Sequence, residues 1–386
     1  MKDFINHTFF PALRFESIDL KGELFYTVST HVSYDLLLID NQKKTEVSLS
    51  KTKNDFFYID NLFSAPQEKF VKFESDLAPF KPALDVVING IAYPPTPCPV
   101  QHFNAAVSIN GKLVEIKVTG PRHWEKTLFG WALSSPEYIK ELEISYDKAF
   151  GGHHEIDEEY HYSSFNPFGC GWYPEAYLKK FRGRHLPAHQ IEFVDQTINS
   201  ISEEQIPAGY GFFGKGWRGR LEYAGTWDDK WKHEKQPGLP DDFSFRYWCG
   251  AHPRLINKLP TIGKITEIKL FNFRSVENQS ESEIAISIPY ELIFIANNYI
   301  GGVTETKDCI LDTIVIDLPS NKVHVTYRII FPKVNSLTST ELFFLNESES
   351  NFFLQKSIEL ANTVNNSNYI LLPPSIRKKL TRKNHG

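Results

Sequence analysis

Residues 75–90 read SDLAPFKPALDVVING, and we expect the rest of the chain to be organised around them. Pro79 and Pro82 each fix the backbone angle φ and lack an N–H, so they predict a rigid, non-helical lead-in. The β-branched run Val86-Val87-Ile88 follows and predicts a short strand. Asn89-Gly90 is a strong turn dipeptide and predicts a tight turn after that strand. The segment therefore predicts a fixed structural corner and does not resemble a catalytic motif.

Three charged residues punctuate the same segment at Asp76, Lys81 and Asp85. We expect their side chains to be buried or half-buried partners that fasten the corner to the glycine- and aromatic-rich segments downstream. Together with Pro82 and Gly90 they make up the predicted structural motif.

Composition is typical of a globular, soluble protein. Of the 386 residues, 41% are hydrophobic and 23% are charged. The aromatic fraction of 14% is high and favours strands over helices. The formal net charge of −5 gives no bulk attraction to nucleic acid or to an anionic membrane, so neither is expected as a partner.

The cysteine pattern and the absence of long apolar runs bear on the compartment. The four cysteines are widely spaced and include no Cys-x-x-Cys pair, which excludes a zinc ribbon and a thioredoxin-type site. Four thiols fit a reducing compartment, although an even count leaves disulfides open. No segment has the apolar core of a signal peptide or the roughly 18 apolar residues of a membrane span. We therefore expect a cytoplasmic protein.

The chain order predicts a mainly β protein with β-sandwich-like sheets, long loops rich in Gly, Pro and aromatic residues, and a short C-terminal helix. Alternating residues around Asn110-Gly111 predict a β-hairpin over residues 105–118. An amphipathic pattern predicts the helix over residues 352–364. The expected units are an N-terminal β-rich unit (1–150), a Gly/aromatic-rich loop region that bridges the sheets (151–260), a C-terminal β-rich unit (261–345), and a helix with a basic tail (346–386).

A cluster of metal-ligand side chains lies between His153 and His161. Imidazoles and carboxylates bind Zn²⁺, and a loop could bring His153, Asp157 and His161 together. The alternative is a solvated polar loop, which we favour because no recognised ligand spacing is matched. The sequence therefore predicts no metal site and no cofactor.

A second histidine pair, His185 and His189, stands four residues apart with Glu192 beyond it. This spacing superficially resembles the helical ligands of zinc proteases. Pro187 lies between the two histidines and disfavours a helix by about 3 kcal/mol. Leu186 also replaces the glutamate that such chemistry uses as a base, so we reject this reading.

Two further segments invite an enzymatic interpretation. Residues 209–216 match the spacing of phosphate-binding loops, but no strand precedes them, no helix follows, and Gly216 replaces the hydroxyl residue that would hold Mg²⁺. Asp228 and Asp229 lie between two tryptophans and could do acid–base work on a carbohydrate, but adjacent residues point in different directions. Dense Trp and Arg, by contrast, are typical of protein-binding surfaces.

Seven segments in fixed order give a more specific signal. The chain resembles a family of bacterial uncharacterised-domain proteins whose genes lie between those for the VgrG spike and for PAAR-like or effector proteins of type VI secretion. The matching segments cover roughly residues 15–295 and are 75–90, 120–124, 146–152, 166–171, 207–211, 224–231 and 239–243. Pro121 departs from the family pattern, and the pentapeptide-repeat extension of some relatives is absent.

The resemblance implies a non-enzymatic adaptor or chaperone that holds a cognate effector and assists its loading onto the VgrG–PAAR tip. A metal-dependent or carbohydrate-active enzyme using the loop at His153–His161 or the pair Asp228/Asp229 is the alternative. A structural component of the secreted spike is a second alternative. For partner binding we expect exposed aromatic and arginine side chains of the segment 207–231, namely Tyr210, Phe212, Phe213, Trp217, Arg218, Arg220, Trp227 and Trp231.

Overall fold

The strand predicted within the opening corner lies inside the largest sheet of the protein. The computed structural model describes residues 3–39, 44–50, 55–64, 69–273 and 283–345. All six residues of β7 (Leu84–Asn89) are buried. The strand is flanked on one side by a parallel neighbour and on the other by an antiparallel one. A strand covered on both faces needs a continuous apolar run, which Val86-Val87-Ile88 supplies.

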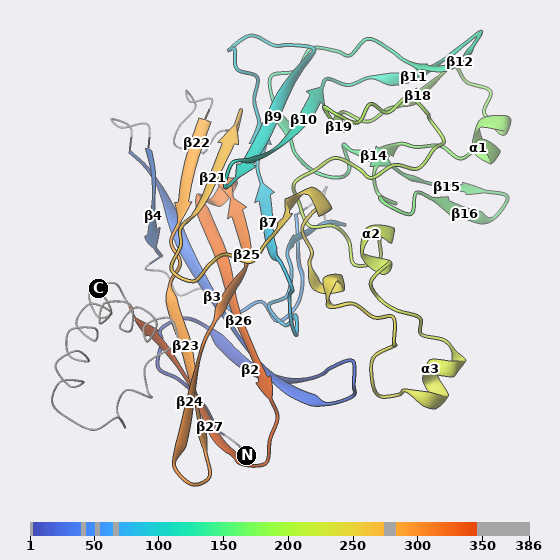
Figure 1. Ribbon diagram of the computed structural model, residues 1–386. Helices are drawn as coiled ribbons and strands as arrows, with labels where there is room; N and C mark the ends of the chain where they lie inside the picture. Colours follow the sequence, from blue (N-terminus) through green and yellow to red (C-terminus); the bar gives the residue numbers. More distant parts are fainter. Residues whose placement is uncertain (1–2, 40–43, 51–54, 65–68, 274–282, 346–386) are drawn as a thin grey trace.

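The described residues form three larger sheets. In Figure 1 the strands of the five-stranded sheet lie in the upper part of the molecule, most of the seven-stranded sheet in the middle, and the four-stranded sheet in the lower part. The seven-stranded sheet has the order β2 (Ala12–Ile18), β3 (Leu24–Ile39), β26 (Lys322–Pro332), β25 (Ile310–Asp317), β7 and β20 (Ile256–Asn257), with β4 (Lys44–Leu49) paired to β3. The five-stranded sheet has the order β19 (Ile191–Phe193), β10 (Lys112–Thr119), β9 (His102–Ile109), β21 (Thr266–Phe271) and β22 (Glu283–Ile288). The four-stranded sheet has the order β1 (Asp3–Asn6), β27 (Leu337–Leu345), β23 (Leu292–Tyr299) and β24 (Val303–Asp308).

Smaller elements fill the middle of the chain. A three-stranded sheet has the order β12 (Gly130–Leu133), β11 (His123–Thr127) and β18 (His185–Pro187). Strand pairs are β5 (Asn61–Leu62) with β6 (Val71–Phe73), β8 (Ile91–Ala92) with β13 (Leu142–Glu143), β14 (Phe150–Gly151) with β17 (Cys170–Gly171), and β15 (His153–Ile156) with β16 (Glu159–Tyr162). The helices are short: α1 (Glu175–Lys180), α2 (Arg218–Leu221), α3 (Asp229–Glu234), and the 3-10 turns η1 (Phe245–Trp248), η2 (Pro253–Leu255) and η3 (Leu318–Ser320).

The expectation of a mainly β chain is confirmed, and so is the hairpin over residues 105–118. Ile109 pairs directly with Lys112, and Asn110 and Gly111 both have positive φ, as a two-residue hairpin turn requires. The predicted tight turn at Asn89-Gly90 is wrong. Asn89 is the buried last residue of β7, and the chain continues through Gly90 into β8.

The two expected β-rich units do not form separate sheets. Each of the three larger sheets combines strands from before residue 150 with strands from after residue 260. One continuous hydrophobic core joins them and includes Val28, Val107 and Ile295. A second, smaller core around Trp124 and Trp172 lies under the three-stranded sheet. The helix expected over residues 352–364 and the basic tail lie outside the described residues.

Candidate functional site

Four strands of the seven-stranded sheet place polar residues directly opposite one another in one row. His31 on β3 pairs with Thr326 on β26. Thr326 pairs in turn with Thr313 on β25, and Thr313 pairs with Asp85 on β7. Directly paired residues point to the same face of a sheet, so these side chains form a polar stripe across it. All four are buried.

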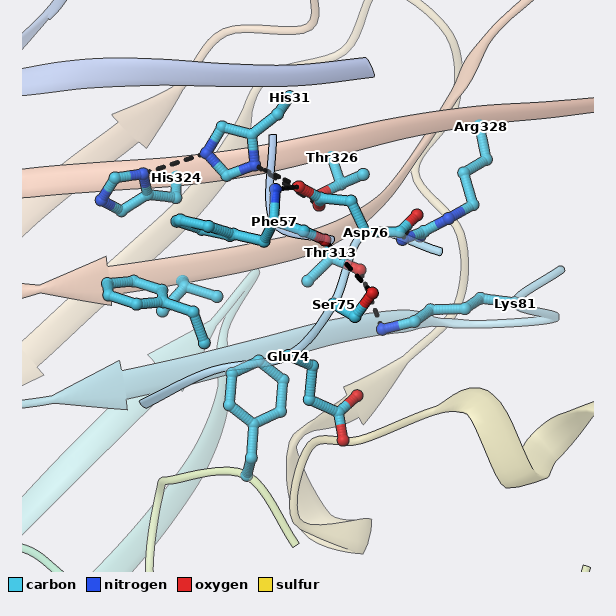
Figure 2. Close-up of a pocket in the computed structure, with 13 residues that line it drawn as sticks. His31, Phe57, Glu74, Ser75, Asp76, Lys81, Thr313, His324, Thr326 and Arg328 are labelled. Carbon is cyan, nitrogen blue, oxygen red and sulfur yellow. Dashed lines mark hydrogen bonds and ion pairs between the residues drawn. The ribbon is translucent and has the colours of Figure 1, made fainter. Parts of the chain in front are cut away.

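The corner lies across this stripe and supplies two charged side chains to it (Figure 2). Asp76 Oδ1 accepts a hydrogen bond from Thr326 Oγ1 at 2.9 Å, and Asp76 Oδ2 lies 3.2 Å from His31 Nδ1. Lys81 Nζ donates to Asp85 Oδ2 at 2.6 Å and to Thr313 Oγ1 at 3.0 Å. Asp76 and Lys81 are therefore bound at opposite ends of the same row.

Further bonds close the network on itself. Thr313 Oγ1 donates to Asp312 Oδ1 at 2.8 Å, and Arg328 pairs with Asp312 while it donates to the Asp76 carbonyl at 3.2 Å. Asp85 Oδ2 also accepts from the Gly250 N–H at 2.7 Å. The expected link between the corner and the downstream loops is thus made by Asp85, whereas Asp76 and Lys81 bind the sheet.

Burial favours the neutral form of each ionisable group in the stripe, but at Asp76 and Lys81 the interactions with charged partners outweigh the effect of burial on the pKa. Burial opposes ionisation of Asp76, yet His31, Arg328 and the Phe57 N–H lower its pKa below the usual value. Burial likewise opposes the charge on Lys81, yet mainly Asp85 raises its pKa. Burial and the neighbouring His31 lower the pKa of His324 to about 3. Asp76 and Lys81 are therefore charged at neutral pH, and His324 is neutral.

The space left beside this network is too small for a substrate. The cavity that these residues line has a volume of about 20 Å³. A cavity of that size holds about one water molecule. Perturbed pKa values often indicate catalysis, but here they accompany a closed set of ion pairs with no room for a reactant. We interpret the stripe as a structural network that holds the corner on the seven-stranded sheet.

The expected exposed loop side chains are mostly interior. Five of the eight are buried, so the expectation of exposure is wrong for Tyr210, Phe212, Phe213, Trp217 and Arg220. The loop's glycines let its backbone approach other side chains closely. A Cβ on Gly209 would lie only 2.6 Å from the ring of Tyr146.

Two of these buried side chains illustrate why they are interior. Tyr210 Oη lies within hydrogen-bond distance of the carbonyls of Ala105 and Val114, at 3.0 and 2.9 Å. Arg220 pairs with Glu74 and donates to the Tyr247 carbonyl. Tyr210 therefore joins the loop to the five-stranded sheet, and Arg220 joins it to Glu74, directly before the corner, so neither side chain faces a partner.

Of the remaining three side chains, Arg218 and Trp227 are exposed and Trp231 is half-buried. Trp227 is 52% exposed and packs edge-on against Trp231, with ring centroids 4.5 Å apart. Trp227 also borders an open cavity of about 470 Å³. The other residues that line this cavity are mostly apolar and aromatic: Ser17, Ile18, Pro79, Ala224, Leu239, Phe243, Phe245, Tyr247 and Trp248.

The metal loop considered between His153 and His161 is a β-hairpin. His153 pairs with Tyr162, and His154 pairs with His161, so His153 and His161 point to opposite faces. Asp157 lies in the turn with positive φ and pairs with Lys180. The three suggested ligands do not converge.

The acidic pair Asp228/Asp229 belongs to a helix start. Asp228 Oδ1 accepts a hydrogen bond from the Trp231 N–H at 2.8 Å and so caps α3. Asp229 lies in the first turn, where its negative charge interacts favourably with the positive end of the helix dipole. Both carboxylates thus have a structural explanation.

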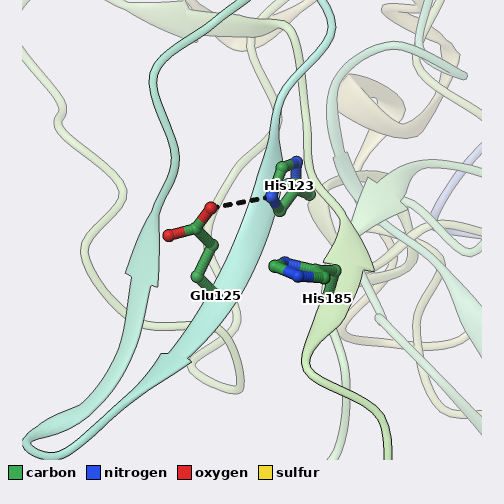
Figure 3. Close-up of side chains that lie close together, drawn as sticks. All are labelled: His123, Glu125 and His185. Carbon is green, nitrogen blue, oxygen red and sulfur yellow. Dashed lines mark hydrogen bonds and ion pairs between the residues drawn. The ribbon is translucent and has the colours of Figure 1, made fainter.

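The structure does bring together three ligand-type side chains that the sequence did not indicate as a set: His123, Glu125 and His185 (Figure 3). Their candidate ligand atoms all lie within 4.8 Å of one another, and His123 Nε2 is 2.9 Å from Glu125 Oε1. The His-x-Glu spacing in β11 is visible in the sequence, but the pairing with β18 that adds His185 is not. His189 is buried elsewhere against Arg122 and Glu192.

Comparison with known proteins identifies a family but no activity. The family described as "Uncharacterized protein conserved in bacteria (DUF2169)" matches residues 27–328. No curated protein and no solved structure matches the chain. The match reaches beyond residue 295, where the sequence resemblance stops, and takes in β25 and most of β26. All four cysteines are free, and no helix among the described residues has the length and apolar character needed to span a bilayer.

Proposed function

The chain belongs to the DUF2169 family of bacterial proteins, and we propose that it is a non-enzymatic adaptor that binds a cognate type VI secretion effector and assists its loading onto the VgrG–PAAR spike. The seven ordered segments of the sequence resemblance suggest this role. The observation that carries it in the structure is the aromatic cavity beside Trp227.

The cavity has the chemistry of a protein-binding pocket. Its aromatic walls and the half-exposed indole of Trp227 offer apolar surface that a partner side chain would cover. Its volume of about 470 Å³ accommodates one or two large apolar side chains. Trp227 lies in segment 224–231 of the resemblance, so we assign this cavity to the partner that such adaptors would share, the VgrG–PAAR spike.

An adaptor needs a second, separate contact, and the β11–β12 hairpin provides one. Leu128 and Phe129 at its tip are 98% and 100% exposed. They are the two most exposed large apolar side chains among the described residues, and a protruding tip suits insertion into a partner's groove. In Figure 1 this hairpin lies at the upper right, whereas α3 beside the cavity lies at the lower right. The tip lies outside the seven segments, so we assign it to the effector.

The alternative functions have less support. An enzyme acting through His153–His161 would need converging ligands, and Asp228/Asp229 serve α3. A structural component of the secreted spike would be recovered with secreted particles, whereas an adaptor that remains in the cell would not. Secretion assays on culture supernatants separate these two roles.

Co-expression with the products of the neighbouring genes tests the proposal. The wild-type chain should retain both an effector and a spike protein. Trp227→Ala should lose the spike protein and keep the effector, and Phe129→Asp should do the reverse. Tyr138→Ala is the matched control, because Tyr138 is 69% exposed and lies outside the cavity and the hairpin tip.

The possible failures have different meanings. If the wild-type chain retains neither partner, the adaptor function is wrong. If it retains both and the two variants behave like Tyr138→Ala, the function stands and the assigned surfaces are wrong. Because Phe129 and Tyr138 are largely exposed, the melting temperatures of their variants should stay close to wild type. Trp227→Ala also removes the packing against Trp231, so its melting temperature is measured beside its binding.

A further inference from the structure

We propose that His123, Glu125 and His185 bind a zinc ion on the outer face of the three-stranded sheet. The three side chains come from two adjacent strands. His123 and Glu125 are two residues apart on β11, so they share a face. His185 on β18 pairs directly with Glu125 and therefore points to that same face. Figure 3 shows the two imidazoles and the carboxylate side by side.

The backbone that carries these side chains is held rigidly from behind. Trp124 lies between the two β11 ligands and points to the opposite face, where it is 1% exposed. Trp124 pairs directly with Leu186, which is also buried in the second hydrophobic core. A metal site built on strands that a core holds in place needs little reorganisation to bind.

The donor set and the spacing suit zinc. Two imidazole nitrogens and one carboxylate oxygen are ligands that zinc accepts, with a fourth position left for water or another ligand. Donor atoms of a tetrahedral zinc site lie about 3.3 Å apart, given Zn–N distances of about 2.0–2.1 Å. The three candidate atoms already lie within 4.8 Å of one another, so small side-chain rotations complete the geometry.

A supporting contact orients one ligand. Ser134 Oγ lies 3.3 Å from His123 Nδ1 and accepts from the His123 backbone N–H at 3.1 Å. When Nδ1 carries the ring proton and donates it to Ser134, Nε2 is free to bind the metal, which is the usual arrangement around zinc-bound histidine. Neither cavity described above includes the three ligands, so we assign the zinc ion a cross-linking role between β11 and β18.

Calorimetric titration of the tag-free, metal-stripped full chain with ZnCl₂ tests the site, and Co²⁺ absorption reports its geometry. One site per chain with tetrahedral Co²⁺ bands is expected. His185→Ala should weaken Zn²⁺ binding about tenfold or more, since loss of even a supporting residue costs roughly 10–100-fold. His233→Ala is the matched control, because this exposed histidine lies in α3 and outside the cluster.

Each outcome decides the matter. A site that His185→Ala weakens and His233→Ala preserves supports the proposal. The proposal is overturned if the wild-type chain shows no such site, if His185→Ala binds Zn²⁺ as the wild type does, or if both variants lose binding equally. His185 is exposed, so an unchanged melting temperature of metal-free His185→Ala would exclude misfolding as the cause. Partner retention does not enter this test, so it stands apart from the adaptor proposal.

Discussion

Replacing Lys81 by Met should remove from the buried stripe the positive charge that balances the carboxylate of Asp85. Lys81 and Asp85 are both almost completely buried, and their charged atoms are 2.6 Å apart. Methionine keeps much of the apolar stem and removes the ammonium group. Asp85 would then retain only the Gly250 N–H on Oδ2, while its Oδ1 already lacks a hydrogen-bond partner among the described residues.

The expected cost follows from this loss. Breaking a buried ion pair by removing one partner destabilises a protein by roughly 3–5 kcal/mol, because the other charge is left uncompensated. Total stabilities are only about 5–15 kcal/mol, so Lys81→Met should remove a large part of the whole. Asp85→Asn should cost a similar amount, because it leaves the ammonium group of Lys81 without its carboxylate.

The double variant separates the ion pair from packing. Lys81→Met with Asp85→Asn leaves no unpaired charge, and the new amide can still accept from Gly250. We therefore expect the double variant to be more stable than either single variant, with a coupling of about 2–3 kcal/mol. Lys179→Met is the matched control, since Lys179 and Glu175 form an exposed pair 3.7 Å apart that should contribute nothing measurable.

Urea unfolding at pH 7, followed by tryptophan fluorescence, gives these free energies if the slope with denaturant is unchanged between variants. Two results would refute the reasoning: a loss below about 1 kcal/mol for Lys81→Met, or a double variant whose loss equals the sum of the two single losses. Either would mean that the stripe is hydrated or dispensable.

Two further predictions concern acid stability and the buried glycine loop. Burial lowers the folded-state pKa of His252 and of His324 to about 3. In the unfolded chain both imidazoles take up a proton below about pH 6.5, whereas in the folded chain they stay neutral down to about pH 3. The free energy of unfolding should therefore fall as pH drops from about 6.5 to 3, by about 2 kcal/mol at pH 5 for each residue. His252→Gln should make that decline shallower in urea unfolding series, and an unchanged slope would contradict the assignment. Gly209→Ala should cost about 1–3 kcal/mol, because its Cβ would meet the Tyr146 ring, whereas Gly216→Ala has open space around it and should be nearly neutral; equal melting temperatures of these two variants would refute the close contact.

Local patterns in the sequence are sufficient to predict individual strands and hairpins but not how the strands pair into sheets. The hairpin over residues 105–118 is specified by alternation and by Asn110-Gly111, which all lie within one short segment. The parallel pairing of β7 with β25 joins residues more than 200 positions apart, and nothing local indicates it. The sequence therefore predicted separate β-rich units where the chain builds shared sheets.

The same distinction between local and distant residues explains why the sequence indicates only part of the polar stripe. Asp76, Lys81 and Asp85 are recognisable as a set because they lie close together in the chain. Their partners His31 and Thr326 come from distant strands, whose register decides which polar residues share a row. Any shift by one residue would turn these side chains to the other face, and no single-sequence pattern fixes that register.

The prediction that the loop aromatics are exposed is wrong for a physical reason. Glycines beside aromatic residues predict flexible, exposed loops when read singly, but they also permit close packing of backbone against rings. Gly209 lies against Tyr146, and Asn166 donates to the carbonyls of Tyr146 and Phe150. The Tyr210 carbonyl accepts from the Ile88 N–H at 3.0 Å, which ties the loop to β7.

These contacts join four of the seven segments that carry the family resemblance: 75–90, 146–152, 166–171 and 207–211. Such segments preserve a framework, and a framework does not by itself define a partner. Changes at Gly209 should therefore remove stability and partner binding together, whereas changes at Trp227 or Phe129 should remove binding of one partner alone. That separation is the physical content of the adaptor proposal. Buried ion pairs hold the interior, and partner recognition is assigned to exposed apolar side chains, namely Trp227 beside the cavity and Leu128 and Phe129 at the hairpin tip.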